Sequence, residues 1–573
     1  MDSEGHLIQV AFFVLLAAAG CGSSDARFPL RDPLWHDTDM RPVTARCHAE
    51  PTPKEPDHVS CAPESYDGTL YWDGIDSLLL RPLSEAVGLA TSGESTNVNS
   101  MDEVPDSAWF TNRLGVRRMS VDELRQNACP SDKLLDPQNA ADGAWLIDKG
   151  KTSGSTAGFR INVPGKGKYL VKLEVRGPER QGAATVIGEA VFYAAGYYAS
   201  CEQLLYVRPS IFKLAPGLVA AKGNFGDVYP FDQKSLDELI ASGTTRAGLL
   251  RITASSWVPG YPIGQFRYEG TRDDDPNDVI PHQNRRELRG ARLLAAWIDH
   301  FDSREGNSLD TWISDSKGGP PDSSPGHVLH YQIGTSAALG SSWDWDDITR
   351  RLGYSYIIDW RDAAVDFITL GAVPRVWDRV QRAPGHEIFG YFNVADFDPE
   401  GWKNEYSNAA FSRMTERDGA WMARILAGFT PEMVRTLADM GQFSDAANTD
   451  YLESVLQGRL SKILERYLTR LSSIADLHVE GAERLCGVDV AEWRGLRDER
   501  EFRYTARVSG GPWLRVERGA GARVCVTLMH ERTGDYLRVL VRDGVAAGPL
   551  IAHLVDLGPK AGYRLVGIER PDR

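Results

Sequence analysis

The sequence has few features of a membrane-spanning, zinc-binding or nucleic-acid-binding protein. After residue 21, no apolar run is long enough to cross a bilayer. The seven cysteines include no Cys-x-x-Cys pair, so their spacing does not predict a structural zinc site. With 64 Lys and Arg against 79 Asp and Glu, the formal net charge is −15. This acidic balance disfavours general binding to nucleic acid or to anionic membranes, and it favours cationic, neutral or protein partners.

The length and composition are those of a folded protein with several domains. At 573 residues the chain is several times the usual domain size, so we expect two or three domains. A hydrophobic content of 42% and a charged content of 25% are ordinary for globular proteins, which disfavours extensive disorder.

The N-terminus resembles a bacterial lipoprotein signal peptide. Residues 7–20 form an apolar run of signal-peptide length, with small residues directly before Cys21. The leader carries no Lys or Arg, and an ordinary cleaved signal or a buried apolar helix are the alternatives. We expect an acylated Cys21 and an exported protein held by lipid at the cell envelope, on its periplasmic or outer-membrane face.

The remaining cysteines are consistent with an oxidising compartment. Without Cys21 six are left, and an even number permits disulfides. We predict the pairs Cys47–Cys61, around a short Pro-rich loop, and Cys486–Cys525, across the C-terminal region. Free buried thiols are the alternative.

Short strand-like runs begin near residue 140. Residues 145–147, 159–161 and 169–173 are such runs, and Gly, Ser and Pro turns separate them. They predict a small antiparallel sheet. A helix is expected to follow over about residues 183–195, where apolar side chains recur at helical spacing.

The middle of the chain has helical periodicity, and its end has strand periodicity. Residues 285–298 predict an amphipathic helix whose Arg286, Glu287 and Arg289 can face solvent, and residues 450–471 carry a continuous apolar stripe. Alternating apolar residues at 524–528 predict strands near the C-terminus.

A motif for phosphoryl-transfer chemistry directly follows the helix over 285–298. His300, Asp302 and Asn307 have the protein-kinase catalytic-loop spacing His-x-Asp-x-x-x-x-Asn. In that chemistry the aspartate orients the attacking hydroxyl, and the asparagine holds a metal ion on the nucleotide phosphates. Asp302 is therefore the candidate catalytic base, and Asn307 is the candidate metal ligand.

Elements that could bind phosphate lie upstream in the order that such a site needs. A turn containing Ser153, Gly154 and Gly158 could place backbone N–H groups on phosphate oxygens, and Lys172 on the next strand but one could reach the same oxygens. Each feature alone is also typical of a hairpin turn or a solvated lysine. Their order before the Asp302 motif favours a nucleotide-binding site.

Two carboxylates that this chemistry requires are missing or displaced. The strand over 328–333 runs into Gly334, where the metal-binding aspartate of an Asp-Phe-Gly element is expected. Asp344 or Asp346 could replace it. In the helix after Lys172, either Thr185 or Glu189 occupies the place of the glutamate that pairs with the lysine.

Four stretches resemble the signatures of a family of exported bacterial proteins of uncharacterised biochemistry: residues 102–113, 275–282, 285–290 and 414–418. The resemblance covers about residues 95–475. Members are similar to atypical kinase-like folds and commonly read Ile-Asp-Phe-Gly where this chain has residues 333–336. The resemblance therefore implies a kinase-like core whose metal site is altered at Gly334.

We therefore expect an α+β protein with a two-lobed kinase-like core, formed by a β-rich N-lobe and a helical C-lobe, and a C-terminal all-β domain. The predicted segments are a signal peptide at 1–21, a tether and irregular segment at 22–95, the N-lobe at 96–255, the C-lobe at 256–476 and a β-sandwich-like domain at 477–573.

The predicted function is binding of a ligand or an envelope protein partner in an interlobe cleft, by a core with impaired catalysis. Lys172 and Asp302 are its candidate catalytic residues, and Ser153, Gly154, Gly158, Lys172 and Glu189 are its candidate cofactor-binding residues. Nucleotide and magnesium are the candidate cofactors. An active metal-dependent phosphotransferase is one alternative, and a structural or adhesive protein that works through its C-terminal β domain is the other.

Overall fold

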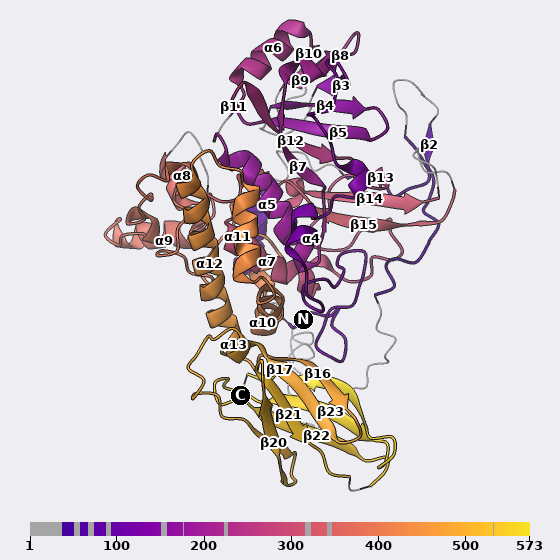
Figure 1. Ribbon diagram of the computed structural model, residues 1–573, viewed down its shortest axis with the longest axis vertical. Helices are drawn as coiled ribbons and strands as arrows, with labels where there is room; N and C mark the ends of the chain where they lie inside the picture. Colours follow the sequence, from indigo (N-terminus) through magenta and orange to yellow (C-terminus); the bar gives the residue numbers. More distant parts are fainter. Residues whose placement is uncertain are drawn as a thin grey trace, which may run out of the picture.

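The computed structural model has an α+β fold with sheets at both ends and helices between them (Figure 1). It describes residues 37–50, 58–66, 74–87, 93–150, 157–175, 177–222, 227–315, 323–340, 346–530 and 532–572. The predicted signal peptide and Cys21 lie outside these residues. In the part of the chain that is described, no helix combines the length and the apolar character needed to cross a membrane.

The first large sheet has seven strands, and we call it the upper sheet (Figure 1). Its order is β11-β12-β5-β4-β3-β8, with β7 also paired to β12, and all pairs are antiparallel except β3 with β8. The predicted strands after residue 140 are confirmed. The strands are β3 (Trp145–Gly150), β4 (Gly158–Val163), β5 (Gly167–Leu173), β7 (Glu202–Val207), β8 (Phe212–Leu214), β11 (Thr245–Arg246) and β12 (Leu249–Ser256).

Smaller elements complete the outer end of the upper sheet. The hairpin of β9 (Val219–Lys222) and β10 (Asp227–Pro230) and the helix α6 (Gln233–Ser242) lie there (Figure 1). Alternate residues of β5 point into the core beneath them, and Tyr169, Val171 and Leu173 are fully buried.

The helix α5 (Arg180–Ala195) lies between the upper sheet and the helices below (Figure 1). It contacts β7 and β12 on one side and α11 (Pro431–Met440) on another. Nearly all of its side chains are buried, as expected for a helix that is covered all round rather than on one face.

The helices form one large core, against which Leu329 of a second sheet packs. The principal helices are α4 (Val121–Gln126), α7 (Arg286–Ile298), α10 (Glu416–Leu426), α11 (Pro431–Met440) and α12 (Ala446–Leu468), with the short α8 (Asp346–Arg351) and α9 (Trp360–Thr369) to one side. The sheet has the order β13-β14-β15-β6, from β6 (Tyr198–Ala199), β13 (Tyr261–Pro262), β14 (Ser308–Ser314) and β15 (Gly326–Gln332). The indole of Trp297 on α7 donates to the Leu456 carbonyl on α12 at 2.8 Å.

The prediction that Arg286, Glu287 and Arg289 face solvent is wrong. All three are buried in a network of opposite charges. Asp418 accepts from Arg286 at 3.2 Å and from Arg289 at 3.3 Å, and Asp102 accepts from Arg286 at 2.7 Å. Helical periodicity detects polar faces, but it cannot distinguish a solvated face from one that is neutralised by partners distant in the sequence.

Both predicted disulfides are present, together with a third. Cys47–Cys61 joins the chain directly before the strand β1 (His48–Ala49) to the chain directly after β2 (Val59–Ser60), and Cys486–Cys525 joins β17 (Arg484–Asp489) to β21 (Arg523–Thr527). Cys129–Cys201 ties the segment after α4 to the start of β7. Such bonds are typical of oxidising compartments. The N-terminal part also contains a helical segment, η1 (Asp76–Leu80) followed by α3 (Arg81–Val87).

The C-terminal strands form two sheets that share one core (Figure 1). One sheet has the order β16-β17-β21-β20, and the other has the order β19-β18-β22-β23-β24. The elements are β16 (Ile474–Glu480), β17 (Arg484–Asp489), α13 (Val490–Trp493), β18 (Thr505–Val508), β19 (Trp513–Leu514), β20 (Val516–Gly519), β21 (Arg523–Thr527), β22 (Tyr536–Arg542), β23 (Leu550–Asp556) and β24 (Tyr563–Glu569). The alternation predicted at 524–528 corresponds to β21.

Candidate functional site

Lys172 and Glu189 interact at the junction of the upper sheet and α5. Lys172 is partly buried on β5, opposite Gly158 of β4. Glu189 on α5 is completely buried. Burial and the neighbouring Glu202 carboxylate raise the pKa of Glu189 to about 8, while the positive charge of Lys172 acts to lower it. Of the two candidates on this helix, Glu189 therefore supplies the carboxyl group that Lys172 influences.

Thr335 connects this pair to the segment after β15. Its hydroxyl lies 3.4 Å from Oε1 of Glu189 and donates to the Thr185 carbonyl at 3.1 Å. The backbone N–H of Ser200 donates to Glu189 Oε2 at 3.1 Å. The segment that begins at Gly334 therefore packs directly against α5.

The same segment returns to the predicted catalytic loop. The β14–β15 hairpin brings Ile333 back to Asn307, and the Ile333 N–H donates to the Asn307 carbonyl at 3.1 Å. The Asn307 amide donates to the backbone carbonyl of Asp302 at 2.5 Å. Gly334 has a φ of +82°, and a Cβ atom there would overlap the Asn307 side-chain oxygen. The chain therefore has no room for an aspartate at position 334 in this conformation.

Residues 333–335 thus link Glu189, on which the charge of Lys172 acts, to Asn307 and Asp302: Thr335 lies next to Glu189, and Ile333 is hydrogen-bonded to Asn307. The linked site residues are Lys172, Glu189, Gly334, Asn307 and Asp302. We call these five residues the lysine–aspartate cluster. Gly158 is next to it, because it lies opposite Lys172 in the β4–β5 register. Ser153, Gly154, Asp344 and the side chain of Asp346 lie outside the described residues.

Asp302 is itself held by neighbours that the sequence motif did not indicate. Arg304 donates to its carboxylate at 2.6 Å, and the carboxyl group of Glu405 is hydrogen-bonded to it. Burial and the negative charge of Asp302 raise the pKa of Glu405 well above its usual value. Glu405 therefore holds a proton at neutral pH and donates a hydrogen bond to Asp302. A polar run over residues 404–408 is the one sequence feature that marks this place.

The helical segment η1–α3 covers the predicted catalytic loop from outside. Arg81 donates to Glu305 at 3.2 Å and to the Ser407 carbonyl at 3.1 Å. Its side chain is largely buried, and it also pairs with Asp76 at 3.1 Å. Residues from the N-terminal part of the chain therefore form part of the surroundings of Asp302.

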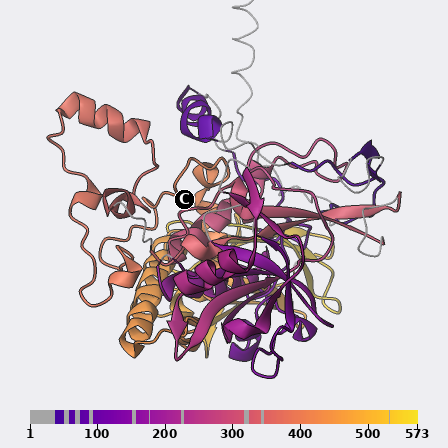
Figure 2. The same cartoon turned by 90° about the horizontal axis from the view of Figure 1, so that it is seen from above.

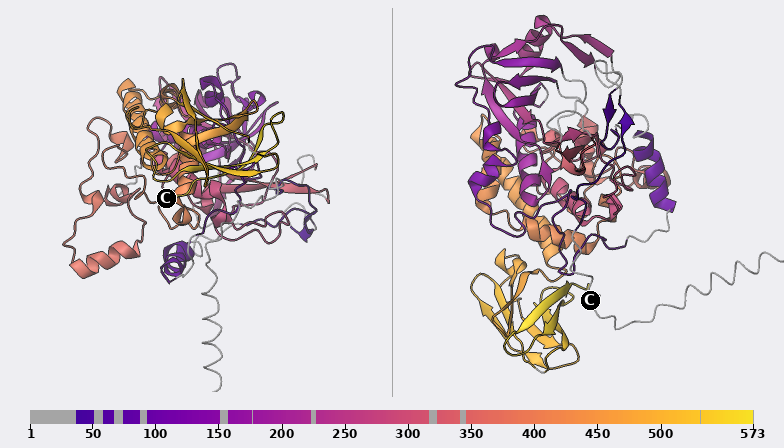
Figure 3. Two further views of the ribbon diagram at one scale, coloured as in Figure 1. Left: turned by 90° about the horizontal axis from the view of Figure 1, so that it is seen from below. Right: turned by 90° about the vertical axis from the view of Figure 1, so that its right-hand side faces the viewer.

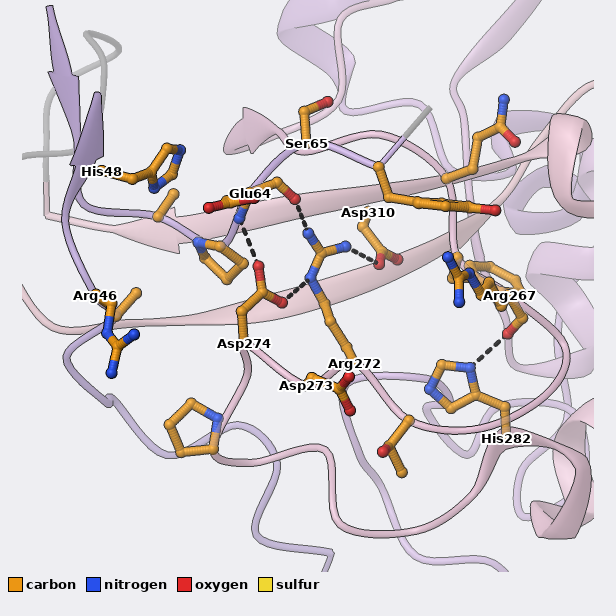
Figure 4. Close-up of a pocket in the computed structure, with 18 of the residues that line it drawn as sticks. Arg46, His48, Glu64, Ser65, Arg267, Arg272, Asp273, Asp274, His282 and Asp310 are labelled. Atoms are coloured by element: carbon orange, nitrogen blue, oxygen red, sulfur yellow. Dashed lines mark hydrogen bonds and ion pairs between the residues drawn. The ribbon is translucent and has the colours of Figure 1, made fainter. Parts of the chain in front are cut away.

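A cavity of about 740 Å³ lies between the disulfide-linked N-terminal hairpin and the loop over residues 265–276 (Figure 4). Arg272 spans its wall and pairs with Asp274 at 2.9 Å and with Asp310 at 3.2 Å. The Glu64 N–H donates to Asp274 at 2.6 Å. None of the lysine–aspartate cluster lines this cavity, so it is a separate feature.

One group of potential metal ligands includes two cysteines that are joined in a disulfide. Glu480, Cys486 and Cys525 lie close together, but the two cysteines form a disulfide and do not provide thiolates.

Comparisons of this chain with family models, with curated proteins and with solved structures give no match.

Proposed function

We propose that this protein is an exported, kinase-like module with impaired catalysis that binds a phosphate-bearing ligand between a β-rich and a helical lobe. The observation that carries the proposal is the set of interactions that links the lysine–aspartate cluster. In protein kinases a strand lysine, a helix glutamate, a catalytic-loop aspartate and asparagine, and an Asp-Phe-Gly element surround the nucleotide phosphates. Four of these residue types are present here, and the interactions of residues 333–335 that link Glu189 to Asn307 support the proposal.

Two features support impaired catalysis. Gly334 stands where the metal-binding aspartate is expected, at a φ of +82° that side chains rarely adopt, and a Cβ atom there would overlap the Asn307 side chain. Asp302 is engaged by Arg304 and by the protonated Glu405, so its carboxylate is less available to a substrate hydroxyl. Metal-dependent phosphoryl transfer depends on both functions.

The protonation of Glu189 supports anion binding by Lys172. With a pKa of about 8, Glu189 is mostly neutral at pH 7 and does not cancel the lysine charge. An ammonium group that is partly buried and lacks a full counter-charge attracts phosphate oxygens more strongly than a solvated one. A phosphate-bearing ligand is therefore the chemical class proposed.

Export is part of the proposal. The disulfides and the lipoprotein-like leader favour an oxidising compartment. Nucleotide triphosphate is scarce outside the cytoplasm. This scarcity favours ligand binding over phosphoryl transfer as the function of the site.

Titration calorimetry with ADP and ATP tests the proposal. We expect binding of similar strength with magnesium and with EDTA, because the metal carboxylate is absent. Lys172→Ala should weaken binding about tenfold or more, since one charge-assisted contact is worth on the order of 1.5–3 kcal/mol. Lys168→Ala is the matched control, because Lys168 is an exposed lysine on the same strand.

Strong magnesium dependence, together with turnover that Asp302→Asn abolishes, would favour an active phosphotransferase instead. Equal binding by the Lys172→Ala and Lys168→Ala variants would refute the assignment of the site.

A further inference from the structure

The helix α9 stands away from the body of the molecule (Figures 2 and 3). It carries large apolar side chains that are exposed to solvent. None of its residues is buried. Phe367 is 83% exposed, Ile368 is 78% exposed and Leu370, directly after the helix, is 91% exposed. Apolar side chains clustered in this way mark interaction surfaces in soluble proteins.

Local contacts hold this helix in a defined conformation. The Asp359 side chain caps it by accepting from the N–H groups of Arg361 at 3.1 Å and Asp362 at 3.2 Å. Arg375 on the returning chain pairs with Asp366 and donates to the Asp362 carbonyl. The apolar end is therefore carried on an ordered helix rather than on a loose loop.

A second exposed apolar surface adjoins α9. On and beside η1–α3, large side chains are between 39% and 55% exposed, namely Ile75, Leu79, Leu80 and Leu83. The half-exposed indole of Trp360, at the start of α9, donates to the Leu78 carbonyl at 3.1 Å. Both helices project from the same side of the molecule (Figures 2 and 3). We call this combined surface the apolar arm.

We propose that the apolar arm inserts into the interfacial layer of an uncharged lipid bilayer. Aromatic and aliphatic side chains on one short, ordered helix, with a tryptophan at its base, are typical of helices that lie in a membrane interface. The inference goes beyond the proposed ligand binding, and it rests on the export and lipid anchoring that the proposed function includes.

The expected lipid anchor places a bilayer within reach. Only about 15 residues separate Cys21 from Asp37, and a chain of that length spans at most ~50 Å. Asp37 is fixed to the body by an ion pair with the buried Arg285 at 2.6 Å. If Cys21 is acylated, the surface of the protein must therefore lie close to the membrane that holds the lipid.

Charge favours neutral over anionic lipid. Between residues 360 and 379 the charges balance, with Arg361, Arg375 and Arg379 against Asp362, Asp366 and Asp378, and the whole chain has a net charge of −15. An anionic surface would repel such a protein, whereas an uncharged one would not.

Vesicle flotation of the chain from residue 21 onward, carrying Cys21→Ser so that no lipid is attached, tests the proposal. The vesicles contain phosphatidylcholine and phosphatidylethanolamine only. The triple variant Phe367→Ser, Ile368→Ser, Leu370→Ser should lose at least about tenfold in binding, because burial of even one such side chain is worth about that factor. These positions are exposed, so the variant should fold.

The matched control is Trp513→Ser, which removes a side chain that is 67% exposed on the C-terminal sheets. It should float as well as the unsubstituted chain. Lys172→Ala, which alters only the proposed ligand site, should also float as well, so that failure of the ligand proposal and failure of the membrane proposal are told apart. A fluorophore on Ile368→Cys should shift to the blue with vesicles, and one on Trp513→Cys should not.

Equal flotation of the triple variant and the unsubstituted chain would overturn the proposal. So would a protein that is dimeric in light scattering and becomes monomeric in the triple variant without binding vesicles, because the arm would then contact a second copy.

Discussion

Replacing Glu189 by glutamine is expected to change how the stability of this protein depends on pH. The pKa of Glu189 rises from an ordinary 4.5 to about 8 in the folded chain, through burial first and the Glu202 carboxylate second. A carboxyl group with a higher pKa when folded holds more protons when folded. Its contribution to stability is therefore fully present below pH 4.5 and is lost as the pH rises towards 8.

The size of the effect follows from the pKa difference. One pKa unit corresponds to about 1.4 kcal/mol, so the native chain could lose on the order of 5 kcal/mol across this window. The Glu189→Gln variant cannot ionise here, and the same packing and hydrogen bonds remain open to its amide. We therefore expect the variant to gain stability relative to the native chain as the pH rises from about 5 to 8, and to stay parallel with it above 8.

Urea unfolding at several pH values measures this difference directly, and subtracting one curve from the other removes the titration of the groups that do not interact with Glu189. Glu238→Gln, on the exposed face of α6, is the control and should leave the pH slope unchanged. Lys172→Met should move the upper limit of the window to higher pH, because the lysine charge lowers the pKa of Glu189. Equal pH slopes for the native chain and Glu189→Gln would refute the reasoning.

Three further substitutions test other parts of the structure. Gly334→Asp should lower the melting temperature, because a side chain at φ +82° costs on the order of 1–3 kcal/mol and overlaps Asn307; an unchanged melting temperature would contradict this conformation. Asp418→Ala should cost about 3–5 kcal/mol in urea unfolding, because it removes the carboxylate that pairs with the buried Arg289 and leaves Arg286 with Asp102 alone, whereas a loss below about 1 kcal/mol would mean that the network is solvated. Arg81→Ala should increase proteolysis within residues 74–87 while global unfolding stays nearly unchanged, and unaltered cleavage would show that this contact does not hold the segment.

Much of the local structure could be predicted because it depends on neighbours in the sequence. Apolar alternation and turn residues predicted β3, β4 and β5, and helical spacing predicted α7 and α12. The pairs Cys47–Cys61 and Cys486–Cys525 followed from an even cysteine count and from position in the chain. The third disulfide joins segments that only the fold brings together.

The candidate site was only partly predictable for the same reason. The spacing of Asp302 and Asn307 is a local property, because the Asn307 side chain donates to the backbone carbonyl of Asp302 within a single turn of the chain. The partner of Lys172, however, depends on how α5 rotates against the sheet, and Glu405 reaches Asp302 from about a hundred residues away. No pattern in the sequence encodes such contacts between distant segments.

The sequence by itself determined the local helices and strands, the acidic net charge, the two predicted disulfides and the order of the motif residues along the chain. These properties follow from backbone preferences and from side-chain periodicity over a few residues. Only the tertiary structure decided that Arg286 and Arg289 are buried, that Glu189 is the carboxyl group beside Lys172, and that the apolar face of α9 is left uncovered. Burial and electrostatic environment are properties of the packed chain, because they depend on which distant surfaces meet and exclude water.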